Sequence, residues 1–230
     1  MSDVVKGQRG LTTERVVDAA LRVADEGGIE AVSLRRLARE LGVTPMAIYR
    51  HVRDKSQLLD LIADRLLEQL ELAPADLPTW QERLRRLASS LLAVLQAHPA
   101  APLLLSRPFN SPAAVRVSEA LLGILDQAGF DSKEAVRLVQ VITGMVLGPA
   151  IHRATYGAAS LEGPPDEASQ QASAEWLSSG QFPYLASAAE ELSDWSAGAD
   201  ADQLTIELLV GGLEALADQQ ERGSATSPPR

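Results

Sequence analysis

Apolar residues recur at spacings of three and four along most of the chain, a pattern that predicts amphipathic helices. The segment 33–52 has the most specific pattern. Ser33 can cap a first helix, whose apolar stripe ends directly before Gly42, where a left-handed backbone is needed. Thr44 and Pro45 are suited to be the N-cap and first residue of a second helix. The segment therefore predicts a helix-turn-helix of the kind that reads DNA.

Longer amphipathic segments surround this one, and capping residues, glycine or proline mark their ends. Asp54 begins a helix that we expect to reach about Leu72 and to connect the helix-turn-helix mechanically to the rest of the chain. The longer helices are predicted over 12–28, 54–72, 80–98, 112–128, 132–156 and 203–219. Short helical turns are expected around 103–105 and 184–192, and loops or tails over 1–10, 157–174, 198–202 and 223–230. The pattern predicts an all-α protein.

Charge is distributed unevenly along this acidic chain. The formal net charge is -10. Residues 1–56 carry ten Lys or Arg against eight Asp or Glu, a net +2, which leaves -12 for the remainder. Because phosphate repels the acidic part, nucleic acid would be approached by the N-terminal part alone. Residues 1–10, with Lys6 and Arg9, are either an arm along the phosphate backbone or an ordinary disordered tail.

Composition narrows the class of protein further. Apolar residues make up 46% of the chain, which is enough for a substantial core, and there is no cysteine for disulfides or thiolate metal sites. The most apolar stretch, 139–151, is interrupted by glutamine, threonine and glycine, and the N-terminus lacks an apolar signal core. We therefore expect a cytoplasmic protein with no membrane partner.

The candidate DNA-binding side chains cluster in and beside the helix-turn-helix. Small and apolar residues begin the second helix, the end that enters a major groove, and they can contact thymine methyl groups. Arginines can bind guanine or phosphate, and tyrosine, histidine and lysine add donors for phosphates. Each one alone could be a solvated surface residue, but together they predict DNA binding. The set is Ser33, Arg35, Arg36, Thr44, Pro45, Met46, Ala47, Tyr49, Arg50, His51 and Lys55.

Enzyme chemistry has no comparable pattern. The chain lacks a G-x-S-x-G motif, a phosphate-binding glycine-rich loop, H-E-x-x-H, and any cluster of His, Asp or Glu at metal-ligand spacing. We therefore expect no enzymatic activity, no cofactor and no metal site. His98 and His152 could meet in a pocket, although buried, hydrogen-bonded histidines are the commoner case. A helical small-molecule-binding protein or enzyme remains the alternative from another class.

Residues 12–58 resemble the N-terminal domain of the tetracycline-repressor (TetR) family. The resemblance rests on A-A-L-x-x-A-D-E-G-G (19–28), S-L-R-R-L-A-R-E-L-G-V (33–43) and I-Y-R-H-V-R-D-K-S-Q-L-L (48–59). It implies an all-helical homodimer with a three-helix DNA-binding domain, here 1–57, a ligand-binding and dimerisation domain, 58–222, and a disordered tail. It also implies that Tyr49, His51 and Lys55 contact phosphates, whereas Arg35 and residues 44–47 face bases.

The C-terminal part resembles the tetracycline repressors themselves, through Trp80-Gln81, Ser106-Arg107-Pro108, 126–130, Leu147-Gly148 and 211–214. Two histidines that hold drug-chelated magnesium in those repressors are replaced here by Glu71 and by a leucine beside a two-residue gap. His152 falls where they have glutamate. We therefore expect a different effector, apolar or aromatic. The candidate effector residues are His98, Arg107, Asn110, Gln140, Met145 and His152.

These inferences predict a ligand-responsive repressor that binds a palindromic double-stranded DNA operator as a homodimer. An activator, or a repressor without a ligand, is the alternative within the same class. Dimerisation is expected to use helices 132–156 and 203–219. Gly211 and Gly212, inside the last helix, each cost about 1 kcal/mol relative to alanine, which close approach of another backbone would offset. That backbone belongs either to the second copy or to the same subunit.

Overall fold

Helices form all the regular structure in the computed structural model of this chain, and the residues it describes contain no strand. Those residues are 10–72, 77–108, 110–159, 175–178, 180–188 and 199–225. The all-α prediction is confirmed. Packing divides the chain into two units, Met1–Gln140 and Val141–Arg230. This division does not test the predicted functional boundary after residue 57.

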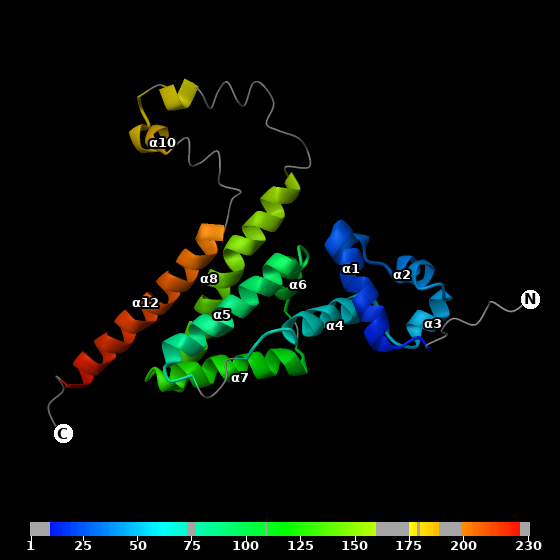
Figure 1. The fold of residues 1–230 in the computed structure, drawn as a ribbon, viewed down its shortest axis with the longest axis horizontal. Coiled ribbons are helices and arrows are strands. Elements are labelled where there is room, and N and C mark those ends of the chain that lie inside the picture. Colours follow the sequence, from blue (N-terminus) through cyan, green and yellow to red (C-terminus); the bar gives the residue numbers. More distant parts are fainter. Residues whose placement is uncertain are drawn as a thin grey trace, which may run out of the picture. The chain divides into compact units, whose positions relative to one another are not determined.

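Three N-terminal helices, α1 (Thr13–Ala31), α2 (Leu34–Glu40) and α3 (Pro45–Tyr49), form a small bundle (Figure 1). The N-cap of α1 is Thr12, whose hydroxyl accepts a bond from the Arg15 N–H. Gly28 interrupts α1 with a φ of 76°, so the regular helix stops at residue 28, where the sequence predicted its end.

Helix α4 (Lys55–Leu67) packs against α1, α6 and α7 and carries the core of the first unit. Its cap is Asp54, as predicted, and Leu58, Ile62 and Leu66 on its stripe are fully buried. The predicted end at Leu72 is wrong, because the helix stops five residues earlier. Beyond Leu67 the N–H groups of residues 69 and 70 bond three residues back, which tightens the last turn and ends the helix.

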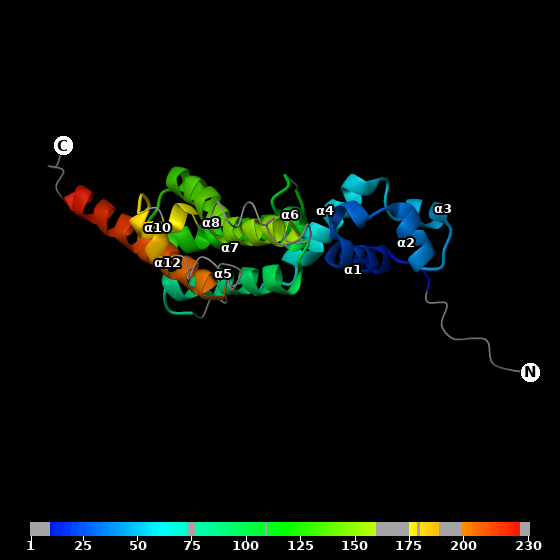
Figure 2. The ribbon, with the colours of Figure 1, turned by 90° about the horizontal axis from the view of Figure 1, so that it is seen from above.

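Helices α5 (Trp80–Ala97), α6 (Ala101–Leu105) and α7 (Pro112–Gln127) complete this packing, and Figure 2 shows α5 and α7 alongside each other. Their boundaries follow the sequence closely. The Thr79 and Ser111 hydroxyls cap α5 and α7 by accepting backbone N–H bonds. Gly129, with a φ of 90°, ends α7 as expected.

The longest helices are α8 (Ser132–Ala159) and α12 (Ala199–Ala225), and a short helix α10 (Pro183–Ser187) lies between them in sequence. The chain is helical again over 175–178. Helix α8 extends into the predicted 157–174 loop by three residues, and α12 begins before and ends beyond the predicted 203–219. The predicted loop from 160, the arm 1–9 and the tail from 226 lie outside the described residues.

Much of the apolar surface of α8 and α12 is uncovered. Val141 and Leu208 are 55% and 59% exposed, in contrast to the fully buried leucines of α4. By length and composition alone, residues 132–155 of α8 could cross a membrane, because the helix is apolar on average despite its glutamine, threonine and glycine residues. An exposed apolar face of this kind can also mark the surface where two copies of a protein pack together.

Candidate nucleic-acid interface

The two helices of the predicted helix-turn-helix are set by their caps. The Ser33 hydroxyl accepts from the Arg36 N–H at 3.2 Å, and the Thr44 hydroxyl accepts from the Ala47 N–H at 3.3 Å. Gly42 has a φ of 65°, which is the left-handed backbone predicted for this turn. Pro45 occupies the first turn of α3, where its missing N–H leaves no bond unmade.

One face of this pair is buried and the other is open. Leu37 of α2 and Ile48 of α3 are fully buried, which fixes both helices to each other and to the bundle. On α3, Met46 is 68% exposed and Tyr49 is 53% exposed. Large apolar side chains left in water at the tip of a well-packed bundle indicate a surface built for contact.

The candidate cations of this surface fall into two groups. The side chains of Arg35 and Arg50 are exposed and make no polar contact among the described residues. Arg36 pairs with Glu26 at 4.0 Å, and Lys55 pairs with Glu30 at 3.6 Å. Exposed ion pairs contribute about 0–1 kcal/mol, so both cations can exchange a carboxylate for a DNA phosphate at small cost.

His51 follows α3 in a turn and contacts the first helix. Its Nδ1 lies 3.3 Å from the Thr13 hydroxyl, across 38 residues of sequence. The Gln57 side-chain oxygen accepts from both the backbone N–H and the Nε–H of Arg53, at 2.8 and 3.3 Å, and so fixes the corner before α4. Sequence spacing gave no signal for the contact of His51 with Thr13, because it depends on how the chain folds back, whereas Arg53 and Gln57 are only four residues apart.

Glu14 sits at the N-terminus of α1, where the helix dipole is positive. Its backbone N–H and the Thr12 hydroxyl hold the pKa of the Glu14 carboxyl below its usual range, with smaller contributions in the same direction from His51 and Arg65. The carboxylate is therefore ionised wherever DNA binding would be measured. It helps order the helix that supports His51.

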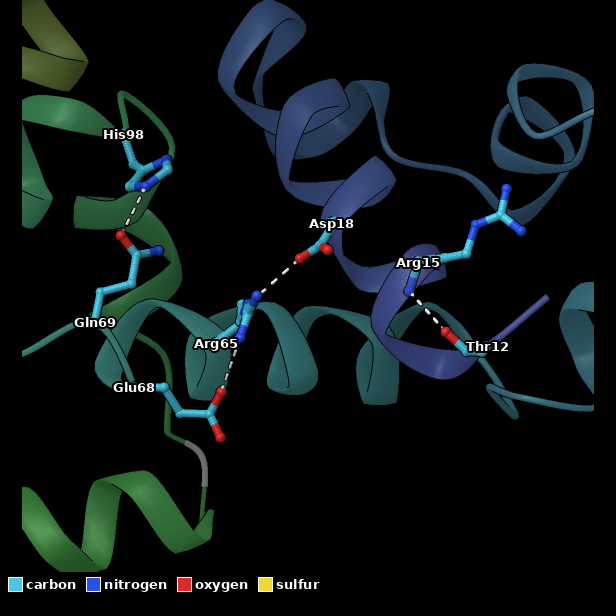
Figure 3. Close-up of polar contacts among 7 residues, drawn as sticks. All are labelled: Thr12, Arg15, Asp18, Arg65, Glu68, Gln69 and His98. Atoms are coloured by element: carbon cyan, nitrogen blue, oxygen red, sulfur yellow. Dashed lines mark hydrogen bonds and ion pairs between the residues drawn. The ribbon is translucent and has the colours of Figure 1, made fainter. Parts of the chain in front are cut away.

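Polar contacts join the three-helix bundle to the helices that follow it. Asp25 of α1 accepts from the Ala100 N–H at 3.3 Å, and its other oxygen lies 2.8 Å from Nδ1 of His98. Nε2 of His98 lies 3.3 Å from the Gln69 side-chain oxygen (Figure 3). Both ring nitrogens therefore face protein groups that tie α1, the end of α4 and the α5–α6 corner together.

Helix α4 makes a second set of such contacts. Arg65 lies between Asp18 of α1, at 3.3 Å, and Glu68, at 3.4 Å (Figure 3). Asp60 pairs with Arg107 at 3.5 Å. Asp64, one turn further along the same helix, accepts from the Ala113 N–H at 2.9 Å, at the start of α7. A change in the position of α6 or α7 would therefore be felt directly by α4.

The candidate effector residues are distributed over both units of the chain. His98 and Arg107 take part in the contacts just described. Asn110 and Gln140 are exposed in the first unit. In the second unit Met145 is half-buried, whereas His152 is exposed and already engaged in a polar interaction. Their role toward an effector stays a prediction.

Position 71 has a partner of its own. The Glu71 carboxylate pairs with Arg86 at 3.1 Å, and its N–H donates to the Ser90 hydroxyl at 2.8 Å. A groove of about 750 Å³ is lined by Gln69, Glu71 and Leu77 on one side and by α5 residues, Arg86 and Ser90 among them, on the other. Within the described part of the chain no group of three or more His, Asp or Glu side chains could hold a metal ion.

Comparison with known proteins agrees with this arrangement. Residues 16–62 match the tetR family of bacterial regulatory proteins, and residues 73–217 match the tetracyclin repressor-like C-terminal domain. The HTH-type transcriptional repressor DrrR1 of Streptomyces coeruleorubidus is 35% identical over 225 residues, which cover 94% of this chain and 82% of DrrR1.

Solved structures show the same fold. Streptomyces coelicolor ActR in complex with actinorhodin has a TM-score of 0.72 and 25% identity, over 90% of this chain and 97% of ActR. BioQ, crystallised with its natural double-stranded DNA operator, has a TM-score of 0.62 and 25% identity, over 90% of this chain and 99% of BioQ. The chain therefore belongs to the tetR family of bacterial regulatory proteins.

Proposed function

We propose that this chain is a cytoplasmic, ligand-responsive transcriptional repressor. It binds a palindromic double-stranded DNA operator as a homodimer and leaves the operator when a small-molecule effector binds. The observation that carries the proposal is the exposed tip of the N-terminal bundle, where Met46 and Tyr49 project from a recognition helix that Ile48 anchors from behind. Named relatives are transcriptional repressors, and one solved neighbour is held on its operator.

The DNA contacts would combine positioning with sequence readout. Tyr49, His51 and Lys55, with Arg36 and Arg50, would bind phosphates, which fixes the register on DNA without specifying sequence. Arg35 and residues 44–47 are proposed to face bases, and Ser33 is proposed to lie in the same interface. Thr44 and Arg35 would form hydrogen bonds, whereas the small apolar edge beginning at Pro45 would contact thymine methyl groups.

Dimerisation is proposed through the uncovered faces of α8 and α12. Leu204 and Leu208 are exposed on α12, as is Val141 on α8. A methyl group added at Gly211 or Gly212 would meet no described atom of this chain within 4 Å. This open space supports close approach of a second copy at the two glycines rather than a tight contact within one subunit. Two bundles would then read half-sites about 34 Å apart.

The effector is proposed to be apolar or aromatic rather than tetracycline with magnesium. The ion pair of Glu71 with Arg86 supports this, because by resemblance Glu71 stands where the tetracycline repressors have a metal-binding histidine, and its carboxylate is already bound by an arginine. ActR, a structural neighbour, is crystallised with actinorhodin. Binding would favour a conformation that spaces the two bundles wrongly, and linkage requires DNA to weaken effector binding by the same factor.

A gel-shift titration on DNA flanking the coding region of this protein tests the central claim. We expect a specific shift whose affinity falls with salt, with a log-log slope that steepens by about 0.9 for each phosphate contacted. A scrambled duplex of the same length is the control. No specific shift, or an affinity indifferent to salt, would refute DNA binding, and a particle of 24.6 kDa at micromolar concentration would refute the dimer.

The effector half of the claim has its own test. Aromatic small molecules are screened for release of the shifted duplex, and each active compound is then titrated against free protein with and without operator. Equal affinity in both titrations would contradict the linkage. An activator is distinguished by a promoter fusion, since deletion of an activator lowers expression whereas deletion of a repressor raises it.

A further inference from the structure

A hydroxyl on α1 contacts the histidine that follows the recognition helix. The Thr13 Oγ1 and His51 Nδ1 atoms are 3.3 Å apart, and both residues are partly buried. Thr12 already caps α1 with its own hydroxyl. The Thr13 hydroxyl is therefore not needed for capping and is available to bind the imidazole of His51.

The chemistry of a neutral imidazole makes this contact consequential. One ring nitrogen carries the proton and donates, and the other accepts. A hydroxyl that donates to Nδ1 holds the proton on Nε2. A DNA phosphate at neutral pH presents only acceptor oxygens, so a neutral histidine can bind it only through the nitrogen that carries the proton.

We propose that Thr13 is a positioning residue for DNA binding, which donates its hydroxyl hydrogen to Nδ1 of His51 and so keeps Nε2–H as the donor to a DNA phosphate. This inference rests on the proposed function. It adds to the interface a residue outside the helix-turn-helix that never contacts DNA itself. The start of α1 thereby determines how the turn after α3 presents its donor.

The test uses the full chain and the operator duplex that the wild type shifts. Thr13→Val keeps the shape of the side chain and removes the hydroxyl, whereas Thr13→Ser keeps the hydroxyl. We expect Thr13→Val to weaken operator binding roughly 3- to 10-fold, the value of one hydrogen bond, and Thr13→Ser to restore it. In a His51→Ala background, Thr13→Val should cause no further loss.

The tautomer is measured separately by long-range proton–nitrogen NMR of the imidazole at about pH 8, where an ordinary histidine is neutral. The wild type should show the proton on Nε2, and Thr13→Val should show a mixture of both tautomers. Thermal unfolding of each variant confirms that the fold is kept.

Three results would overturn the proposal. They are wild-type affinity in Thr13→Val, an affinity for Thr13→Ser as weak as that of Thr13→Val, or a wild-type proton on Nδ1. If the wild type shifts no DNA at all, the proposed function fails instead. The NMR measurement then still reports whether Thr13 sets the tautomer of His51.

Discussion

The N-terminal bundle and the long helices α8 and α12 differ in how they satisfy their apolar surface. In the bundle the stripe residues are buried within the chain, and the large apolar side chains left exposed, Met46 and Tyr49, lie on the recognition helix. On α8 and α12 exposed valines and leucines continue along the helices. The first region buries its apolar stripes within one copy, whereas the second leaves apolar side chains uncovered, which the proposed dimer would bury.

The largest expected effect is on the stability of the N-terminal bundle. Ile48→Ala removes a fully buried side chain beneath the recognition helix and should cost about 2–5 kcal/mol of unfolding free energy. Urea denaturation followed by circular dichroism measures the loss. The control is Val115→Ala on α7, where the side chain is 59% exposed and a change of at most about 0.5 kcal/mol is expected. Equal losses for the two variants would mean that the bundle core is not specifically packed.

The second prediction tests whether the long helices need a partner. Leu208→Glu places a charge on the exposed apolar face of α12, and in a symmetric dimer it does so twice. The dimer dissociation constant should rise on the order of hundredfold, as at other interface hot spots. Light scattering across a concentration series measures it, with the exposed polar position Gln219→Glu as control. A dimer unchanged by Leu208→Glu would place the interface elsewhere.

Features that depend on neighbouring residues could be predicted from the sequence. Caps and turn glycines act within four or five residues, so Ser33, Gly42, Thr44, Asp54, Ser111 and Gly129 were assigned correctly from spacing alone. The end of α4 was missed because no glycine or proline marks it. Its stripe continues to Leu70, which stays buried after the helix has tightened into a turn.

Contacts between distant segments were beyond sequence pattern. The pairs of Asp25 with His98, Asp60 with Arg107 and Thr13 with His51 each join residues that only the fold brings together. His98 and Arg107 were predicted to contact an effector because they are polar residues near a predicted pocket. In the structure they bind Asp25 and Asp60 and so connect helices, and the spacing of residues in a sequence cannot distinguish that role from ligand binding.

The third prediction separates the two kinds of cation on the bundle. Arg35→Ala removes an arginine that has no partner among the described residues, and operator affinity should fall by about 1–3 kcal/mol with relaxed preference at one base pair. Arg36→Ala removes a cation that Glu26 already neutralises in part, so a smaller loss, equal across operator sequences, is expected. Gel shifts on the operator and on single-base variants measure both. Unchanged binding by Arg35→Ala would remove Arg35 from the interface.

The smallest effect concerns one carboxylate at the start of α1. Because its backbone N–H and Thr12 hold the pKa of Glu14 below the ordinary value of 4.5, the ionised form stabilises the folded state. That contribution is fully present above pH 4.5 and is lost as the pH falls through the lowered folded-state value. Glu14→Gln should therefore lower the urea midpoint slightly at about pH 7, and the difference from wild type should shrink toward about pH 3. Glu119→Gln, an exposed carboxyl within α7, is the matched control. A midpoint difference that grew on acidification would show that the Glu14 carboxylate opposes folding, and the bundle would then lose one of the local polar contacts that make it self-sufficient.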